Sequence, residues 1–267
     1  MASIEVLTSG IWQLSSVVLA DGGECLVVDP GYFPRELEEL GRLARERGKV
    51  RATVFTHGHW DHVVGWQTFP EAEVWGSESL AQAISQGTPR AQGDLARAKD
   101  FDGRWYVERP TPLRWPQKAR GLKDGEKLQV GQLAITALSL PGHSVDGVAL
   151  VLERPRLLLV GDYLSPCEIP FVEDVAAYQA TLRRLSQVLD SVDEIIPGHG
   201  PRLTPERARE ILQADLVYLE GLARFAAKGD VAGALAMRWP RAEDVPGMRD
   251  HHLENLEAVG LKPPRPG

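Results

Sequence analysis

The sequence predicts an α/β protein built as a four-layer αββα sandwich with a helical C-terminal extension. Two stretches, 11–75 and 127–196, alternate apolar β-rich segments with turn residues, and each also contains an amphipathic helical segment. Beyond Pro201 the apolar spacing is helical throughout. Two sheets with helices on their outer faces account for this order. We therefore expect one domain over residues 1–203 and a helical extension over 204–267 that packs on it.

The first β-rich stretch is expected to begin with a hairpin. Its strands are predicted at Ile11–Ala20 and Glu24–Val28, around an Asp-Gly-Gly turn. Apolar residues then recur at helical spacing over Pro34–Arg47, and Gly48 provides a stop. A short buried strand over Arg51–Phe55 follows. This order predicts a β-β-α-β start to the first half.

The middle of the chain is less regular. A strand is expected at Ala72–Trp75 and a short helix at Glu78–Ser85. Residues 87–118 are polar and rich in Pro and Arg, with some helix predicted near Gly93–Lys99. Long ordered loops in compact domains are often functional. We expect this segment to form a wall of a substrate site.

The second half repeats the strand-rich pattern and ends in helices. The predicted strands are Lys127–Val130, Leu133–Leu140, Gly147–Leu152, Arg156–Val160 and Val192–Ile196. The predicted helices are Val175–Leu189, Pro205–Ala227, Val231–Arg238 and Ala242–Val259. The Pro-rich tail Lys262–Gly267 is expected to fray.

Composition limits the kind of partner. The 267 residues can bury a large core without structural metals, so a metal site here would serve chemistry. The formal net charge of -7 gives no reason to expect a nucleic-acid partner. No apolar run is long enough to span a bilayer, and no signal peptide is visible. Cys25 and Cys167 form no spaced pair. We expect a cytoplasmic protein with a small-molecule substrate and no membrane contact; a homo-oligomer is one open alternative.

The strongest chemical signal follows the predicted strand Arg51–Phe55. Four side chains that can bind a metal ion fall in one short segment: His57, His59, Asp61 and His62. Imidazole nitrogen and carboxylate oxygen both suit zinc, and Gly58 should let the backbone bend so that these side chains converge. The alternative is a polar loop with incidental histidines. Because the whole chain has only 7 His, a cluster of three favours a metal site.

Three further residues occupy similar positions. His143 and His199 each follow a predicted strand and a Pro-Gly turn. Asp162 comes at the end of an apolar run, where a carboxylate is unusual and could bind a metal ion. The alternative is that Asp162 only forms a turn. Each signal is weak alone, but together they would place ligands at the same edge of the sheets as the first cluster.

These motifs resemble the metallo-β-lactamase fold superfamily. The resemblance rests on His57-x-His59-x-Asp61-His62, followed in order by His143, Asp162 and His199, and it covers about residues 4–201. It implies that the first metal is held by His57, His59 and His143 and the second by Asp61, His62 and His199, with Asp162 bridging both. Asp29 resembles an early acidic position of that family and would fix a ligand loop by hydrogen bonds.

The resemblance also implies an activity. Two divalent cations, zinc first and iron or manganese as alternatives, would share a bridging hydroxide that attacks an ester, thioester or lactone bond. Asp61 would be the catalytic residue that orients this hydroxide. The glyoxalase II-like branch is the nearest comparison, although basic residues for glutathione cannot be located. An alternative is a mono-iron sulfur dioxygenase-like oxidoreductase, and a nucleic-acid phosphodiesterase is a further one; retention of His62 and His199 favours two metals and hydrolysis.

Other residues have weaker signals. His251 and His252 are expected to pack or face solvent, although one of them could reach the pocket. Tyr163 could donate to a substrate oxyanion, but packing is the favoured interpretation. Cys167 is left out of the ligand set because Asp162 already resembles the bridging position. Core packing is also the default for the five tryptophans that could line an apolar cleft, which are Trp60, Trp66, Trp75, Trp105 and Trp115.

Overall fold

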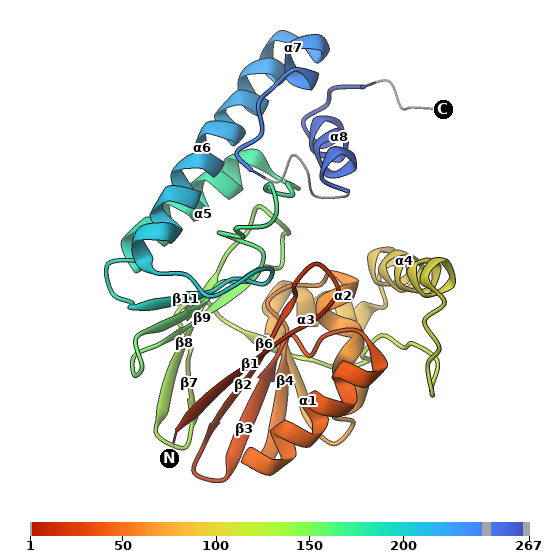
Figure 1. Cartoon of the computed structure of the whole chain (residues 1–267), viewed down its shortest axis with the longest axis vertical. Helices are drawn as coiled ribbons and strands as arrows, with labels where there is room; N and C mark the ends of the chain where they lie inside the picture. Colours follow the sequence, from red (N-terminus) through yellow and green to blue (C-terminus); the bar gives the residue numbers. More distant parts are fainter. Residues whose placement is uncertain (1, 242–246, 264–267) are drawn as a thin grey trace.

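The chain folds into two β-sheets that lie face to face, with helices on their outer sides (Figure 1). The computed structural model describes residues 2–241 and 247–263. The first sheet has its strands in chain order: β1 (Ser3–Thr8), β2 (Ser15–Asp21), β3 (Glu24–Val28), β4 (Lys49–Val54), β5 (Glu73–Ser77) and β6 (Arg120–Leu122). β1, β2 and β3 pair antiparallel, whereas β3 to β6 pair parallel.

The second sheet has the order β11-β10-β9-β8-β7. Its strands are β7 (Lys127–Val130), β8 (Leu133–Ser139), β9 (Val148–Leu152), β10 (Leu157–Leu159) and β11 (Glu194–Ile196). The β10–β11 pair is parallel and the other pairs are antiparallel. Both β10 and β11 are central to the site below, because they end at the same edge of the sheet.

Helices complete the outer layers and the C-terminal region. They are α1 (Pro34–Arg47), α2 (Trp60–Val63), the 3-10 turn η1 (Val64–Thr68), α3 (Glu78–Gln86), α4 (Pro89–Trp105), α5 (Val175–Val188), α6 (Pro205–Lys228), α7 (Val231–Leu235) and α8 (Met248–Ala258). Side-chain caps set the start of α3, α5, α6 and α7; for example, Asp174 accepts from the Ala177 amide at α5, and Thr204 accepts from the Arg207 amide at α6.

Three layers of apolar contact hold the sandwich together. Between the sheets, Val17, Leu26 and Val54 of the first pack with Ile135 and Leu150 of the second. Outside the first sheet, Leu40 and Ala44 of α1 cover Val18 and Val27. Outside the second sheet, Leu182 and Leu185 of α5 share a cluster with Ile211, Leu212 and Leu219 of α6. These clusters are the physical form of the predicted αββα arrangement with a helical C-terminal region, which is confirmed.

Two parts of the predicted secondary structure are wrong. The strand expected at Ile11–Ala20 begins only at Ser15, because Trp12 and Gln13 adopt left-handed backbone conformations with φ of 47° and 55°. β1 was not predicted; it adds to the hairpin by pairing with β2.

The segment 87–118 contains more helix than expected. The helix predicted near Gly93–Lys99 is the centre of α4, which runs over Pro89–Trp105. The segment then leads into the short strand β6, which had no clear sequence signal. Of the last predicted helix, Ala242–Val259, the structure shows α8; residues 242–246 lie outside the described residues, as do residues 264–267 of the tail expected to fray. Among the described residues, no helix is both long and apolar enough to cross a membrane.

Candidate metal centre

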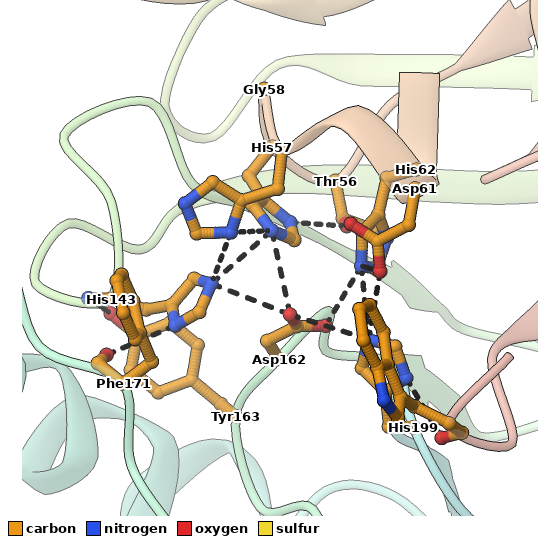
Figure 2. A network of polar contacts seen from close by, with 12 residues as sticks. Thr56, His57, Gly58, Asp61, His62, His143, Asp162, Tyr163, Phe171 and His199 are labelled. Carbon is orange, nitrogen blue, oxygen red and sulfur yellow. Dashed lines mark hydrogen bonds and ion pairs between the residues drawn. The ribbon is translucent and has the colours of Figure 1, made fainter. Parts of the chain in front are cut away.

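All seven residues predicted to bind metal lie together at one edge of the sandwich (Figure 2). His57 follows β4, His143 follows β8, Asp162 follows β10 and His199 follows β11. Backbone hydrogen bonds join the two sheets here: the Val148 amide donates to the Thr56 carbonyl at 2.7 Å, and the Ser15 amide donates to the Gly198 carbonyl at 2.7 Å. The sheet edges are therefore fixed against each other where the side chains converge.

The first group consists of His57, His59 and His143 with one oxygen of Asp162. His57 Nε2 lies 2.9 Å from His59 Nδ1, and His143 Nε2 lies 3.2 Å and 3.1 Å from those two atoms. Asp162 Oδ2 lies 3.5 Å from His57 Nε2 and 3.4 Å from His143 Nε2. Three imidazole nitrogens and one carboxylate oxygen thus face a common point.

The second group consists of Asp61, His62 and His199. His62 Nε2 and His199 Nε2 are 3.3 Å apart, and Asp61 Oδ2 lies 3.6 Å and 3.4 Å from them. Asp162 reaches this group too, since its Oδ1 lies 3.2 Å from His62 Nε2 and its Oδ2 lies 3.5 Å from His199 Nε2. Asp162 therefore stands between the two groups, the position that the sequence predicted for a bridging carboxylate.

The outer ring nitrogens fix the tautomer of three of these histidines. In each, Nδ1 lies beside an oxygen that can only accept, so Nδ1 carries the proton in the neutral ring and Nε2 presents a lone pair. The acceptors are Asp29 Oδ2 for His62 (2.9 Å), the Phe171 carbonyl for His143 (3.0 Å) and the Trp12 carbonyl for His199 (2.9 Å).

The tautomer of His57 follows from Asp29. Thr56 Oγ1 donates its only proton to Asp29 Oδ2 at 2.7 Å, so it accepts from His57 Nδ1 at 3.1 Å. Asp29 Oδ1 also accepts from the Thr56 amide at 2.8 Å. One carboxylate therefore orients His57 through Thr56 and His62 directly, which is the role expected for Asp29.

This donor set fits divalent cations. Four Nε2 lone pairs point toward one another and toward carboxylate oxygens, with no proton between them in the neutral rings. Such an arrangement is repulsive unless positive charge lies among the donors. Imidazole and carboxylate are the ligands that zinc, iron and manganese accept, and outer hydrogen bonds of this kind are what hold histidine ligands in place.

The electrostatic field of the centre favours positive charge. Burial lowers the pKa of His57, and the neighbouring imidazoles lower it further. Burial also disfavours the charged forms of His62 and His199, but the surrounding carboxylates outweigh it and raise both pKa values. Burial opposes ionisation of Asp162, yet the same imidazoles hold its pKa well below the usual range. Metal ions would compete with protons for these nitrogens.

Two glycines allow the close approach of the loops. A Cβ on Gly198 would lie 2.2 Å from Asp162 Oδ1, so a side chain there would displace the carboxylate. A Cβ on Gly58 would lie 2.7 Å from Asp146 Oδ2 and 2.9 Å from a Leu80 methyl group. Gly58 is thus required for close packing of the loop; the structure shows no left-handed backbone there.

A cavity of about 450 Å³ opens onto the centre. Its walls come from the loop before β2, the helices α2, α4 and α8, and the segment between β10 and α5. The residues that line it are Trp12, His59, Trp60, Asp61, Arg97, Asp100, Phe101, Arg104, His143, Asp162, Glu168, Ile169, Phe171, His199, His251 and Glu254. Helix α4, from the segment 87–118, forms one wall of this cavity; that the segment contacts a substrate stays a prediction.

The residues with weaker sequence signals have different surroundings in the structure. His251 lines the cavity and its ring lies 5.7 Å from that of Phe171, whereas His252 is buried and pairs with Tyr218 Oη at 2.8 Å. Tyr163 is also buried; its hydroxyl accepts from the His143 amide at 2.9 Å and lies 2.9 Å from the Pro141 carbonyl. It holds the turn that carries His143, in agreement with the packing interpretation.

The structure also shows where Cys167 and the tryptophans lie. Cys167 belongs to none of the candidate ligand groups in the described residues, and burial raises the pKa of its thiol. Trp60 lines the cavity, and Trp75 is buried between neighbouring strands and the other sheet. Trp66 and Trp115 line a separate cavity of about 790 Å³ that contains none of the predicted ligands. Trp105 is 64% exposed.

Sequence reasoning missed three contributors to the site. Glu168 lies in the irregular segment after β10, and burial together with Asp162 and Asp61 raises its pKa to about 7. Trp12 holds His199 through its carbonyl. Arg97 and Arg104 of α4 line the cavity. Only the last pair had a usable signal, since they lie two helical turns apart on the face that also carries Phe101.

Known proteins resemble this chain in both sequence and fold. Residues 10–199 match the family model described as the metallo-beta-lactamase superfamily. The acyl-coenzyme A thioesterase MBLAC2 of Gallus gallus is 27% identical over 204 residues, which cover 68% of this chain and 70% of that protein.

Two solved structures share the fold. The metallo-beta-lactamase family protein TTHA1429 of Thermus thermophilus has a TM-score of 0.67 at 21% identity and covers 97% of this chain and 94% of its own. TTHA1623, solved in a di-iron-bound form, has a TM-score of 0.56 at 25% identity and covers 77% and 96%. The family model spans most of the chain, including every residue of the centre. The chain therefore belongs to the metallo-beta-lactamase superfamily.

Proposed function

We propose that the protein is a metal-dependent hydrolase that cleaves a thioester or ester bond of a small molecule. One observation carries this proposal: two complete groups of donor atoms share the Asp162 carboxylate, and a cavity opens onto both. His57, His59 and His143 would hold one divalent cation, and Asp61, His62 and His199 the other, with Asp162 between them. When bound, the two cations would lower the pKa of a shared water and polarise the substrate carbonyl.

The protein's own groups would position the reaction. Asp61 Oδ2 lies at the cavity wall, 3.4 Å from His199 Nε2, where it can accept a proton from a water molecule and hold it in line for attack. His62 and His57 are kept in one tautomer by Asp29 and Thr56, so their Nε2 atoms cannot turn away. Asp61 would thus be the catalytic carboxylate, while Asp29 would act as a positioning residue.

A thioester is the substrate bond that we favour. A thiol has a pKa near 8.5, so a departing thiolate needs little help from a general acid. The cavity lining contains Trp12, Trp60 and Phe101, an apolar wall suited to an acyl group or a thiol arm. Hydrolysis of an acyl-coenzyme A is the activity in the name of the similar Gallus gallus protein.

The basic residues of α4 suggest the rest of the substrate. Apart from histidines, Arg97 and Arg104 are the basic side chains in the cavity lining. Within the described part of the chain, neither forms an ion pair or hydrogen bond. Guanidinium groups bind phosphate with well-defined geometry. We infer that the substrate carries an anionic group, as the phosphates of coenzyme A do.

Zinc is the metal that we propose first. The first group is rich in imidazole, which suits zinc. Iron and manganese are the alternatives, and a structural relative was solved with two irons bound. The second donor group, Asp61, His62 and His199, favours a two-metal hydrolase over mono-iron oxygen chemistry, which would not need it.

The proposal is tested by a substrate screen on protein of known metal content. Thioesters, lactones, β-lactams and phosphodiesters are compared, with chelator-stripped protein as the control. We expect thioesters to be hydrolysed fastest and the activity to return on adding zinc. Asp61→Asn should fold normally but lose about 100-fold or more in kcat. Turnover of Asp61→Asn at the wild-type rate would exclude the catalytic role of Asp61, and one iron per chain with oxygen consumption would exclude the hydrolase.

A further inference from the structure

A third carboxylate stands beside the second donor group. Glu168 lies on the segment between β10 and α5, and its side chain lines the cavity. One of its carboxylate oxygens lies within 4.8 Å of an oxygen of Asp162 and of a ring nitrogen of His199, which are themselves no farther apart. These three atoms could hold a single ion, although Glu168 has no place in the ligand set that the sequence predicted.

Among the described residues, Glu168 has no Lys or Arg partner and shares the imidazole of His199 with Asp61 and Asp162. Within residues 2–241 and 247–263, no Lys or Arg forms an ion pair with its carboxylate. Arg241, which contacts the same segment at Ser165, is engaged elsewhere: it donates to the Ser165 carbonyl at 2.6 Å and to Asp215 at 2.5 Å. The groups that act most strongly on Glu168 are His199 and the carboxylates Asp162 and Asp61.

Three carboxylates around one position repel one another. Placing a carboxylate in a partly water-excluded site costs several kcal/mol unless a cation or hydrogen-bond donors compensate. For Asp61 and Asp162, the imidazoles His62 and His199 are close enough to do this. Glu168 adds a third carboxylate that shares His199 with the other two, and a bound divalent cation at the second position would supply the further positive charge.

We propose that Glu168 is an additional ligand of the second metal position and makes this position richer in oxygen than the first. The inference rests on the metal centre of the proposed function. The first position would have three imidazoles and Asp162. The second would have two imidazoles with Asp61, Asp162 and Glu168. Carboxylate oxygen suits manganese, whereas imidazole suits zinc and iron, so the two positions should differ in metal preference.

The test measures metal binding directly. Metal-free wild type, Glu168→Gln, Glu168→Asp and Asp100→Asn are titrated with Mn²⁺ followed by electron paramagnetic resonance, and with Zn²⁺ against a chromophoric chelator. Asp100 is a matched control, because it lines the same cavity but belongs to none of the donor groups. Melting curves of each metal-free variant check that it is folded.

The expected result is specific to one position and one metal. Glu168→Gln should weaken Mn²⁺ binding at one of two positions by about tenfold or more, by analogy with the loss of groups that support metal ligands. Zn²⁺ binding should weaken less, Glu168→Asp should be intermediate, and Asp100→Asn should match wild type. Equal Mn²⁺ affinities in wild type and Glu168→Gln would overturn the proposal. If wild type binds two ions but hydrolyses no thioester, only the proposed function fails.

Discussion

At the scale of single residues, Asp29 explains why the centre is ordered without a ligand role of its own. Its left-handed backbone, with φ of 46°, turns the carboxylate under the loop that follows β4. There it accepts three hydrogen bonds, from the Thr56 amide, the Thr56 hydroxyl and His62 Nδ1. Because all three are donors, only a group that accepts on both oxygens can replace it.

Asp29→Asn should therefore weaken metal binding although no candidate ligand is changed. The amide NH₂ would face donors, so either His62 or Thr56 would lose its partner. We expect metal affinity to fall by about 10- to 100-fold, measured by chelator competition. Asp21→Asn serves as a control carboxylate remote from the centre; it accepts from the Gln132 amide. Unchanged metal affinity in Asp29→Asn would contradict the positioning role.

At the scale of elements, α4 contributes the arginine side chains of the cavity wall. Its Arg97, Phe101 and Arg104 recur at helical spacing and face the cavity, while Ala98 is buried behind them. Tyr32 anchors the helix through its hydroxyl, which lies 2.6 Å from Asp102 Oδ1 and 2.8 Å from the Ala98 carbonyl. These contacts hold α4 against the segment after β3, with Arg97 and Arg104 lining the cavity.

The double substitution Arg97→Ala with Arg104→Ala should raise KM for a coenzyme A thioester by about tenfold or more, since each charged contact contributes about 1 kcal/mol or more. The KM for the matching thioester of uncharged N-acetylcysteamine should not change, nor should kcat for either substrate. Lys99→Ala, on the same helix but outside the cavity lining, is the control. Equal KM changes for both thioesters would show that the two arginines do not recognise an anionic group of the substrate.

At the scale of the whole molecule, the C-terminal helices are tied to the loop that carries the centre. Arg241 donates to the Ser165 carbonyl, beside Asp162 in the chain, and to the buried carboxylate of Asp215 on α6. Burial raises the pKa of Asp215 to about 6, and Arg241 opposes this rise. The stability contribution of a group with a raised folded pKa is present at low pH and lost as pH rises through that value.

Arg241→Ala should consequently destabilise the protein more at pH 8 than at pH 5. Without the guanidinium, the ionised Asp215 carboxylate would be buried without a partner, at a cost of about 3–5 kcal/mol. At pH 5 the carboxyl can take up a proton and the cost is smaller. Urea unfolding at both values measures the difference, and adding Asp215→Asn should recover much of the loss at pH 8. An equal loss at both pH values would contradict this account.

The sequence by itself determined the type of fold and identified the candidate ligands that converge. Period-2 and helical apolar patterns predicted most strands and helices, because burial of one face imposes that spacing wherever an element packs on a core. The motif His57 to His62 and the later His143, Asp162 and His199 were recognisable because each follows a strand, and the ends of neighbouring strands meet at one edge of a sheet.

The tertiary structure alone decided which groups surround those ligands. Glu168 and the Trp12 carbonyl lie in irregular segments, where no periodic pattern relates sequence position to direction in space. β1 and β6 form only because a neighbouring strand offers its free edge. The direction of the Arg97 and Arg104 side chains depends on how α4 docks through Tyr32, a contact between segments far apart in the chain. Local pattern thus determined most elements and the candidate ligands, and long-range packing determined the cavity around them.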